Sequence, residues 1–295
     1  MSPPNKRTAT LIGSTAILMW GLLALFTTLT GKVPPFLLAA LAFGTATALI
    51  AAKWLVRREN VITHLKQPLG AWAVGVIGLF GYHFFYFMAL RNAPPVEAGL
   101  IAYMWPLLIV LFSALLPGER LRWFHLAGTL AGLAGAVLLI TGGQGLAGFK
   151  SEFTLGYVMA VCCALTWSSY SVINRRFGHV PTDTVGGFCA ATAVLAALCH
   201  MAFETTVWPA DTGEWIAVLG LGLLPLGLAF FAWDHGTKHG DIRVLGAFAY
   251  AAPLLSTVIL ISFGKGEATW AVAAGCLLIV GGAVLAAKEM LFPKT

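Results

Sequence analysis

The chain has 295 residues, of which 59% are hydrophobic and 10% are charged, and its mean hydropathy is +0.85. A soluble protein of this length carries about a quarter charged residues, so the composition indicates a protein that crosses a membrane several times. The net charge of +6 does not indicate nucleic-acid binding, because Lys and Arg gather in the cytoplasmic loops of membrane proteins and no long basic run is present.

Ten apolar runs are long enough to cross about 30 Å of hydrocarbon, which takes about 20 residues per helix. The first follows Lys6 and Arg7 without a cleavage site, so we expect it to be retained. The predicted spans are Ala9–Leu29, Pro35–Val56, Leu69–Leu90, Val96–Leu116, Phe124–Thr141, Leu155–Asn174, Thr184–Phe203, Trp215–His235, Val244–Phe263 and Trp270–Lys288.

The positive charges support this count. With the N-terminus in the cytoplasm, fourteen of the 18 Lys and Arg residues fall in cytoplasmic segments. The four in outer segments are Lys32, Arg91, Lys150 and Lys265. Because one missed span would invert everything after it, this bias predicts ten spans with both termini in the cytoplasm.

The fourth and the ninth predicted spans each carry a proline in the middle of the membrane. The fourth reads AGLIAYMWPLL from Ala98, and the ninth reads LGAFAYAAPLL from Leu245. Tyr103 and Pro106 in the first segment correspond to Tyr250 and Pro253 in the second, each pair 147 residues apart. A proline removes an N–H and frees a carbonyl one turn back. We therefore predict a break in both spans, with Pro106 and Pro253 as hinge or gating positions.

The interval of 147 residues recurs along the whole chain. It relates Trp20 to Trp167, Pro34 to Pro181 and Gly128 to Gly275. The sequence thus predicts two repeats, residues 1–147 and 148–295, with five spans in each. Because five is odd, the second repeat enters the membrane from the opposite side. The predicted fold is an all-α membrane protein of ten helices, arranged as two inverted five-helix repeats around a central cavity.

This organisation resembles the EamA domains of the drug/metabolite transporter superfamily over essentially the whole chain. The resemblance rests on the two five-span repeats and on Trp20, Trp167, Pro106, Pro253, Glu119 and Glu267. The two glutamates are 148 residues apart, so their equivalence needs a one-residue adjustment. The block GYHFFYFMALRNAPPVEAGLIAYMWPLL, residues 81–108, is similar to bacterial inner-membrane aromatic amino acid exporters of the YddG type. The resemblance implies export of amino acids.

Several aromatic residues lie too deep for the interfacial belt that Trp and Tyr usually form. A buried phenol or indole N–H needs a partner or a wet cavity, so we predict that these side chains line a substrate cavity; helix packing is the alternative. The predicted substrate-binding residues are Trp20, His83, Tyr86, Tyr103, Trp105, Trp167 and Tyr250. By contrast, Trp72, Trp123, Trp208, Trp215 and Trp270 lie near span ends and fit the belt.

His83 is the one titratable residue near the middle of a predicted span. Ionisable residues inside a membrane are candidates for function. We expect His83 either to contact the substrate carboxylate or sense protons, or to be a neutral histidine bonded to a neighbouring helix.

Polar residues also end the sixth and eighth predicted spans: Asn174, Arg175, Arg176, Asp234, His235 and Lys238. We interpret them as solvated helix ends, with a gate network as the alternative. Glu97, near Arg91 at the start of the fourth span, is interpreted in the same way.

The five cysteines lie in apolar runs without metal-ligand spacing, and there is neither a phosphate loop nor a buried carboxylate pair. We expect no metal, no cofactor, no sodium coupling and no enzymatic activity. The main hypothesis is an inner-membrane exporter of Phe, Tyr, Trp and other neutral amino acids, working by alternating access with facilitated exit favoured over proton coupling. The alternatives are export of other metabolites or drugs and, more distantly, a membrane-embedded lipid-modifying enzyme. A monomer suffices for export, and the sequence does not give the oligomeric state.

Overall fold

The computed structural model describes residues 5–118, 120–143, 150–264 and 267–292. Within these ranges the regular structure is helical, with no strand. The helices are α1 (Lys6–Gly21), α2 (Leu23–Leu29), α3 (Pro35–Val56), α4 (Val61–Leu65), α5 (Leu69–Val76), α6 (Tyr82–Asn92), α7 (Pro95–Ala102), α8 (Trp105–Ser113), α9 (Trp123–Thr141), α10 (Thr154–Asn174), α11 (Val185–Phe203), α12 (Thr212–Leu223), α13 (Ala229–His239), α14 (Ile242–Phe248), α15 (Ala251–Ser262), α16 (Trp270–Ala286) and α17 (Lys288–Leu291). Short 3-10 helices lie at Ser151–Phe153 (η2), Arg175–Phe177 (η3) and Thr182–Thr184 (η4). Two π-helices lie at Ile77–Gly81 (η1) and Leu224–Leu228 (η5).

Nine helical segments in the described part of the chain are long and apolar enough to cross a membrane. They correspond to the first nine predicted spans, and Pro35–Val56 agrees at both ends. The segment predicted to end at His235 continues to His239. The tenth predicted span corresponds to α16, which has only 17 helical residues and ends at Ala286. The sequence therefore located these nine spans but misjudged several of their ends, and the tenth stays a prediction.

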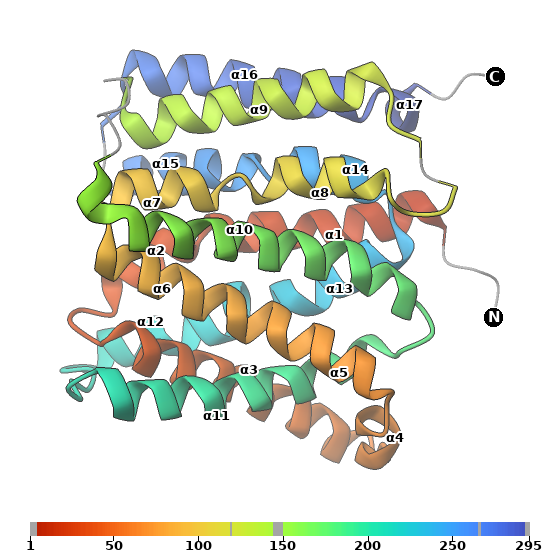
Figure 1. Ribbon diagram of the computed structural model, residues 1–295. Coiled ribbons are helices and arrows are strands. Elements are labelled where there is room, and N and C mark those ends of the chain that lie inside the picture. The colour runs from red at the N-terminus through yellow and green to blue at the C-terminus, as the bar shows by residue number, and fades with distance from the viewer. Residues whose placement is uncertain (1–4, 119, 144–149, 265–266, 293–295) are drawn as a thin grey trace.

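Figure 1 shows the helices running roughly parallel in one bundle, with α9 and α16 at one edge and α3 and α11 at the other. Between these edges, α1 packs against α13 and α10 packs against α6. The start of α1 and the short helix α17 lie at the same end of the bundle. We call this end the α1 end.

Glycines allow close contacts between helices. A Cβ atom added to Gly135 on α9 would lie 2.8 Å from the carbonyl oxygen of Gly275 on α16. A Cβ atom on Gly13 would lie 2.8 Å from the Cα atom of Gly236, where α1 crosses α13. Larger residues at these positions would force the backbones apart, so these two helix pairs depend on glycine.

The fourth and ninth spans are broken before Pro106 and Pro253, where the sequence predicted. The chain leaves α7 at Tyr103–Met104 and starts α8 at Trp105, directly before Pro106. It leaves α14 at Ala249–Tyr250 and starts α15 at Ala251, two residues before Pro253.

The two π-helices were not anticipated. The η1 and η5 segments lie 147 residues apart, as do α6 and α13, which follow them. A π-bulge widens the helix by one residue per turn and disturbs its hydrogen bonds. Gly78 and Gly81 in the first, and Pro225 and Gly227 in the second, were the available sequence signals.

Candidate functional site

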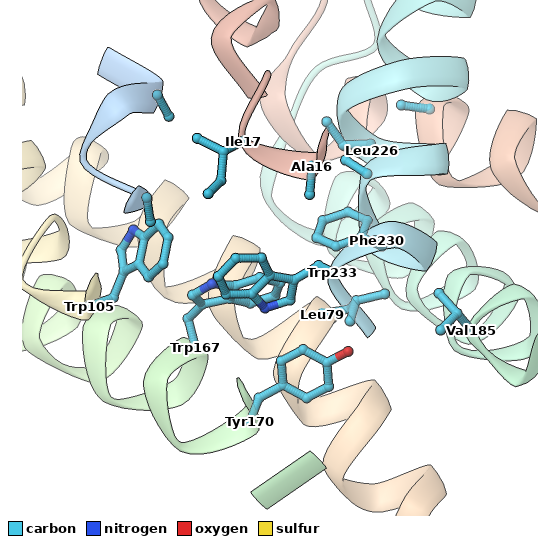
Figure 2. Packing of buried hydrophobic residues seen from close by; sticks show 14 of the residues in the cluster. Ala16, Ile17, Leu79, Trp105, Trp167, Tyr170, Val185, Leu226, Phe230 and Trp233 are labelled. Carbon is cyan, nitrogen blue, oxygen red and sulfur yellow. The ribbon is translucent and has the colours of Figure 1, made fainter. Parts of the chain in front are cut away.

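Four tryptophans meet in the middle of the bundle. Trp20, Trp105, Trp167 and Trp233 come from α1, α8, α10 and α13, and the ring centroids of every pair are 5.1 to 6.3 Å apart. Figure 2 shows Trp105, Trp167 and Trp233 pointing toward one another. We call these four residues the tryptophan cluster. The sequence predicted an open cavity at this depth of the bundle. In this conformation the four rings are in direct contact and occupy that space.

The cluster contains three of the residues that the sequence singled out and one that it missed. Trp20 is half-buried, while Trp105 and Trp167 are only 4% and 3% exposed. Trp233 is fully buried, and its indole N–H donates to the Ser171 hydroxyl at 3.1 Å. Trp233 was overlooked because it stood two residues from the predicted end of its span, whereas α13 continues to His239.

Three tyrosines form a second group beside the cluster. The rings of Tyr82 and Tyr86 stack 6.1 Å apart on α6, and the Tyr82 ring lies 5.3 Å from that of Trp167. Tyr103 lies 6.2 Å from Trp105 at the break between α7 and α8. All three are half-buried, and each carries a hydroxyl that can donate or accept a hydrogen bond. We call Tyr82, Tyr86 and Tyr103 the tyrosine face; Tyr82 was not predicted.

His83 lies on α6 next to this face. Its ring is 5.1 Å from Phe43, 6.1 Å from Phe230 and 6.0 Å from Phe87. Its Nδ1 atom lies 2.7 Å from the carbonyl oxygen of Leu79, inside the π-helix η1.

The second π-helix also provides a backbone carbonyl that bonds an aromatic side chain. The indole N–H of Trp20 donates to the carbonyl of Pro225, inside η5, at 3.1 Å. Each π-helix therefore supplies a backbone carbonyl that orients one aromatic ring at the centre of the protein. This use follows from the disturbed hydrogen bonding of a π-bulge.

Tyr250 has a different position from the other predicted site residues. Its side chain is fully buried, and its hydroxyl oxygen accepts the backbone N–H of Leu107 at 3.2 Å. That N–H lies in the first turn of α8, where backbone donors have no partner within the helix. In this conformation Tyr250 therefore pairs a backbone donor that the break in the fourth span leaves free, and its side chain has no accessible surface.

A buried polar network lies near the α1 end, where the sequence predicted solvated helix ends. Asp234 is completely buried and accepts hydrogen bonds from Asn174 at 2.9 Å, Thr182 at 2.8 Å and Lys238 at 2.9 Å. Lys238, only 5% exposed, also donates to the carbonyl of Val180 at 3.1 Å. The prediction was wrong for Asn174, Asp234 and Lys238, because hydropathy does not reveal that the sixth and eighth spans pack together here.

Glu97 also differs from its expected exposure. It is 9% exposed in the first turn of α7, and one carboxylate oxygen is buried without a hydrogen-bond partner. Arg91 donates instead to the carbonyl of Phe203. Of the two glutamates in the EamA resemblance, Glu267 is exposed before α16 and Glu119 lies outside the described residues.

One group of side chains has the composition of a metal site. Single ligand atoms of Glu59, His64 and Asp183 lie within 4.8 Å of one another. The ammonium of Lys53, however, hydrogen-bonds Asp183 and lies 3.6 Å from Glu59. A lysine thus supplies the positive charge, and the group joins the end of α3 to the segment that leads into α11.

The central arrangement combines apolar rings with polar atoms at their edges. The tryptophan cluster offers ring faces, the tyrosine face offers three hydroxyls, and His83 offers one imidazole nitrogen. Trp105 and Trp167 each add an indole N–H, which is a hydrogen-bond donor. Such a site suits a small molecule with an apolar body and a polar head.

Comparison with known proteins gives one family. The EamA-like transporter family matches residues 7–141 and again residues 154–288. The chain is 56% identical to the aromatic amino acid exporter YddG of Ancylobacter novellus, over 96% of this chain and 98% of that protein. It is 24% identical to the aromatic amino acid exporter YddG of Escherichia coli over 95% and 97%, and 25% identical to the pseudopaline exporter CntI of Pseudomonas aeruginosa over 82% and 81%. A solved crystal structure with 54% identity superposes with a TM-score of 0.91, covering 98% of this chain and all of that one.

Proposed function

The chain belongs to the EamA-like transporter family, and we propose that it exports aromatic amino acids, and other neutral ones, across the bacterial inner membrane by alternating access. It is a multi-pass membrane transporter of small molecules and not an enzyme, since its relatives are named exporters and transporters. The observation that carries the substrate proposal is the tryptophan cluster beside the tyrosine face. Aromatic rings stack favourably on aromatic rings, by about 0.5–1.5 kcal/mol per pair beyond burial.

We propose further that residues 1–147 and 148–295 are inverted repeats of five spans each. Both boundaries of the two family matches are 147 residues apart, as are the two π-helices. Exchanging the halves maps α1 onto α10 and α6 onto α13, so the contacts α1–α13 and α10–α6 are one contact made twice. This symmetry supports a tenth span at α16, although that helix is short.

The orientation follows from the charges. The start of α1 and helix α17 lie at the same end of the bundle. An even number of spans would place the two ends of the chain on the same side of the membrane in this way. The excess of Lys and Arg in the segments at this end supports the proposal that the α1 end faces the cytoplasm.

In an alternating-access mechanism, the tyrosine face and the Asp234–Lys238 network would have different roles. In the conformation described, the half-buried tyrosine face retains accessible surface, whereas the Asp234–Lys238 network is sealed at the cytoplasmic end. We propose that the substrate meets the tyrosine face and that the breaks before Pro106 and Pro253 act as hinges between two access states.

Counterflow in proteoliposomes tests the proposed function. We expect purified protein to exchange labelled phenylalanine, tyrosine and tryptophan with an internal pool, and the initial rate to be independent of an imposed pH gradient because exit is facilitated. Exchange of amphipathic cations or unrelated metabolites, without exchange of amino acids, would instead favour the wider exporter function. A pH gradient that drives accumulation would contradict facilitated exit.

A further inference from the structure

We infer that the Nε2 atom of His83 is the hydrogen-bond acceptor for the ammonium group of the exported amino acid. The inference deepens the proposed function and rests on it. It replaces the two substrate-side roles considered from the sequence, a contact with the carboxylate and proton sensing, by a third role. The argument depends on which ring nitrogen carries the proton.

The tautomer of His83 follows from its partner on the other side of the ring. A backbone carbonyl can only accept a hydrogen bond, so the Nδ1 atom that lies 2.7 Å from the Leu79 oxygen must carry a hydrogen. In a neutral imidazole one nitrogen donates and the other accepts, so Nε2 then holds a lone pair. The π-helix that positions the Leu79 carbonyl thereby sets the chemistry at the opposite edge of the ring.

The surroundings of His83 favour the neutral form. The rings of Phe43, Tyr82, Phe87 and Phe230 lie around it, with centroids 5.1 to 6.1 Å away. No carboxylate in the described part of the chain forms an ion pair with it. A second proton would therefore create a charge among apolar rings without a partner, which is costly.

The two ends of an amino acid need different partners. An ammonium group has three donors and no acceptor, whereas a carboxylate only accepts. Nε2 of His83, which only accepts, therefore fits the ammonium group and would repel the carboxylate. The hydroxyls of the tyrosine face and the indole N–H groups of Trp105 and Trp167 can donate to the carboxylate. His83 and these donors together would fix the direction in which the amino acid enters.

Three ligands separate the two ends. Phenylalanine has both groups, phenethylamine lacks the carboxylate, and 3-phenylpropionate lacks the ammonium. We would titrate each by calorimetry into purified wild-type protein and into His83→Phe, which keeps a ring but loses the acceptor. A hydrogen bond to a charged group predicts that phenylalanine and phenethylamine bind about 10- to 100-fold more weakly to the variant, with 3-phenylpropionate unchanged. Exposed His179, changed to Phe in the same way, should leave all three affinities unchanged.

The opposite pattern, with only 3-phenylpropionate and phenylalanine weakened, would overturn the inference in favour of a carboxylate contact. Equal affinities in wild type and His83→Phe would overturn it as well. Should His83→Phe not fold, His83→Gln offers an amide N–H for Leu79 and an oxygen for the ammonium, and it should keep the preference for phenethylamine over 3-phenylpropionate; its loss counts against the inference. Wild-type protein that binds no phenylalanine at all would refute the proposed function itself, a result distinct from any effect of the variants.

Discussion

Replacing Asp234 with alanine is expected to cost about 3–5 kcal/mol of folding free energy, which is the usual effect of removing one partner of a buried ion pair. The Asp234 carboxylate is completely buried and holds Asn174, Thr182 and Lys238. Without it, the Lys238 ammonium would stay buried with only the Val180 carbonyl as a partner. The thermal unfolding midpoint of the detergent-purified variant, or the loss of a monodisperse gel-filtration peak, measures this effect.

The double variant Asp234→Asn with Lys238→Met is the matched control. Asparagine keeps an acceptor for Asn174, while methionine removes the ammonium without removing its chain volume, so neither charge is left alone. Replacing both partners of a buried pair is often close to neutral. We therefore expect the double variant to be clearly more stable than Asp234→Ala. An Asp234→Ala protein as stable as wild type, or a double variant no better than the single one, would contradict the assignment of this network.

Much of the fold was predictable because a membrane restricts the chain severely. Every backbone polar group must be satisfied within the protein, so long apolar runs become helices, and a proline in one of them disturbs the hydrogen bonds of that helix. The breaks before Pro106 and Pro253 therefore followed from two residues.

The site was only partly predictable, because its details depend on which helices meet. Trp20, Trp105 and Trp167 were predicted to share one site because all three lie deep in their spans, and their rings do lie side by side in the structure. It did not reveal that Asp234 and Lys238 pair in the interior, because a residue near a span end has no signature of its partner helix. The π-helices were missed as well, since an extra residue in a turn leaves the apolar pattern almost unchanged.

Trp167 shows why the choice of substitution decides whether substrate binding can be tested. Its ring lies within 6.3 Å of six other aromatic rings, from Trp20, Tyr82, Trp105, Tyr170, Phe230 and Trp233. Truncating so buried a tryptophan costs about 3–5 kcal/mol. Trp167→Ala would thus lower stability and flux together. It cannot show by itself that Trp167 binds substrate.

Tyr103→Ala separates these effects better and is expected to lower phenylalanine flux in proteoliposomes roughly 10- to 100-fold while lowering the unfolding midpoint much less than Trp167→Ala does. Tyr103 is half-buried, and its ring lies 6.2 Å from that of Trp105 and 6.4 Å from that of Tyr250, so its removal costs less packing than the removal of Trp167, which is in contact with six rings. Tyr103→Phe, which removes only the hydroxyl, should show a smaller part of the same loss. Trp123→Ala is the control, because Trp123 is 69% exposed at a span end and should not affect flux. If Tyr103→Ala transported phenylalanine at the wild-type rate, the tyrosine face would not be the substrate site, and the ring cluster beside it would have to be explained by packing alone.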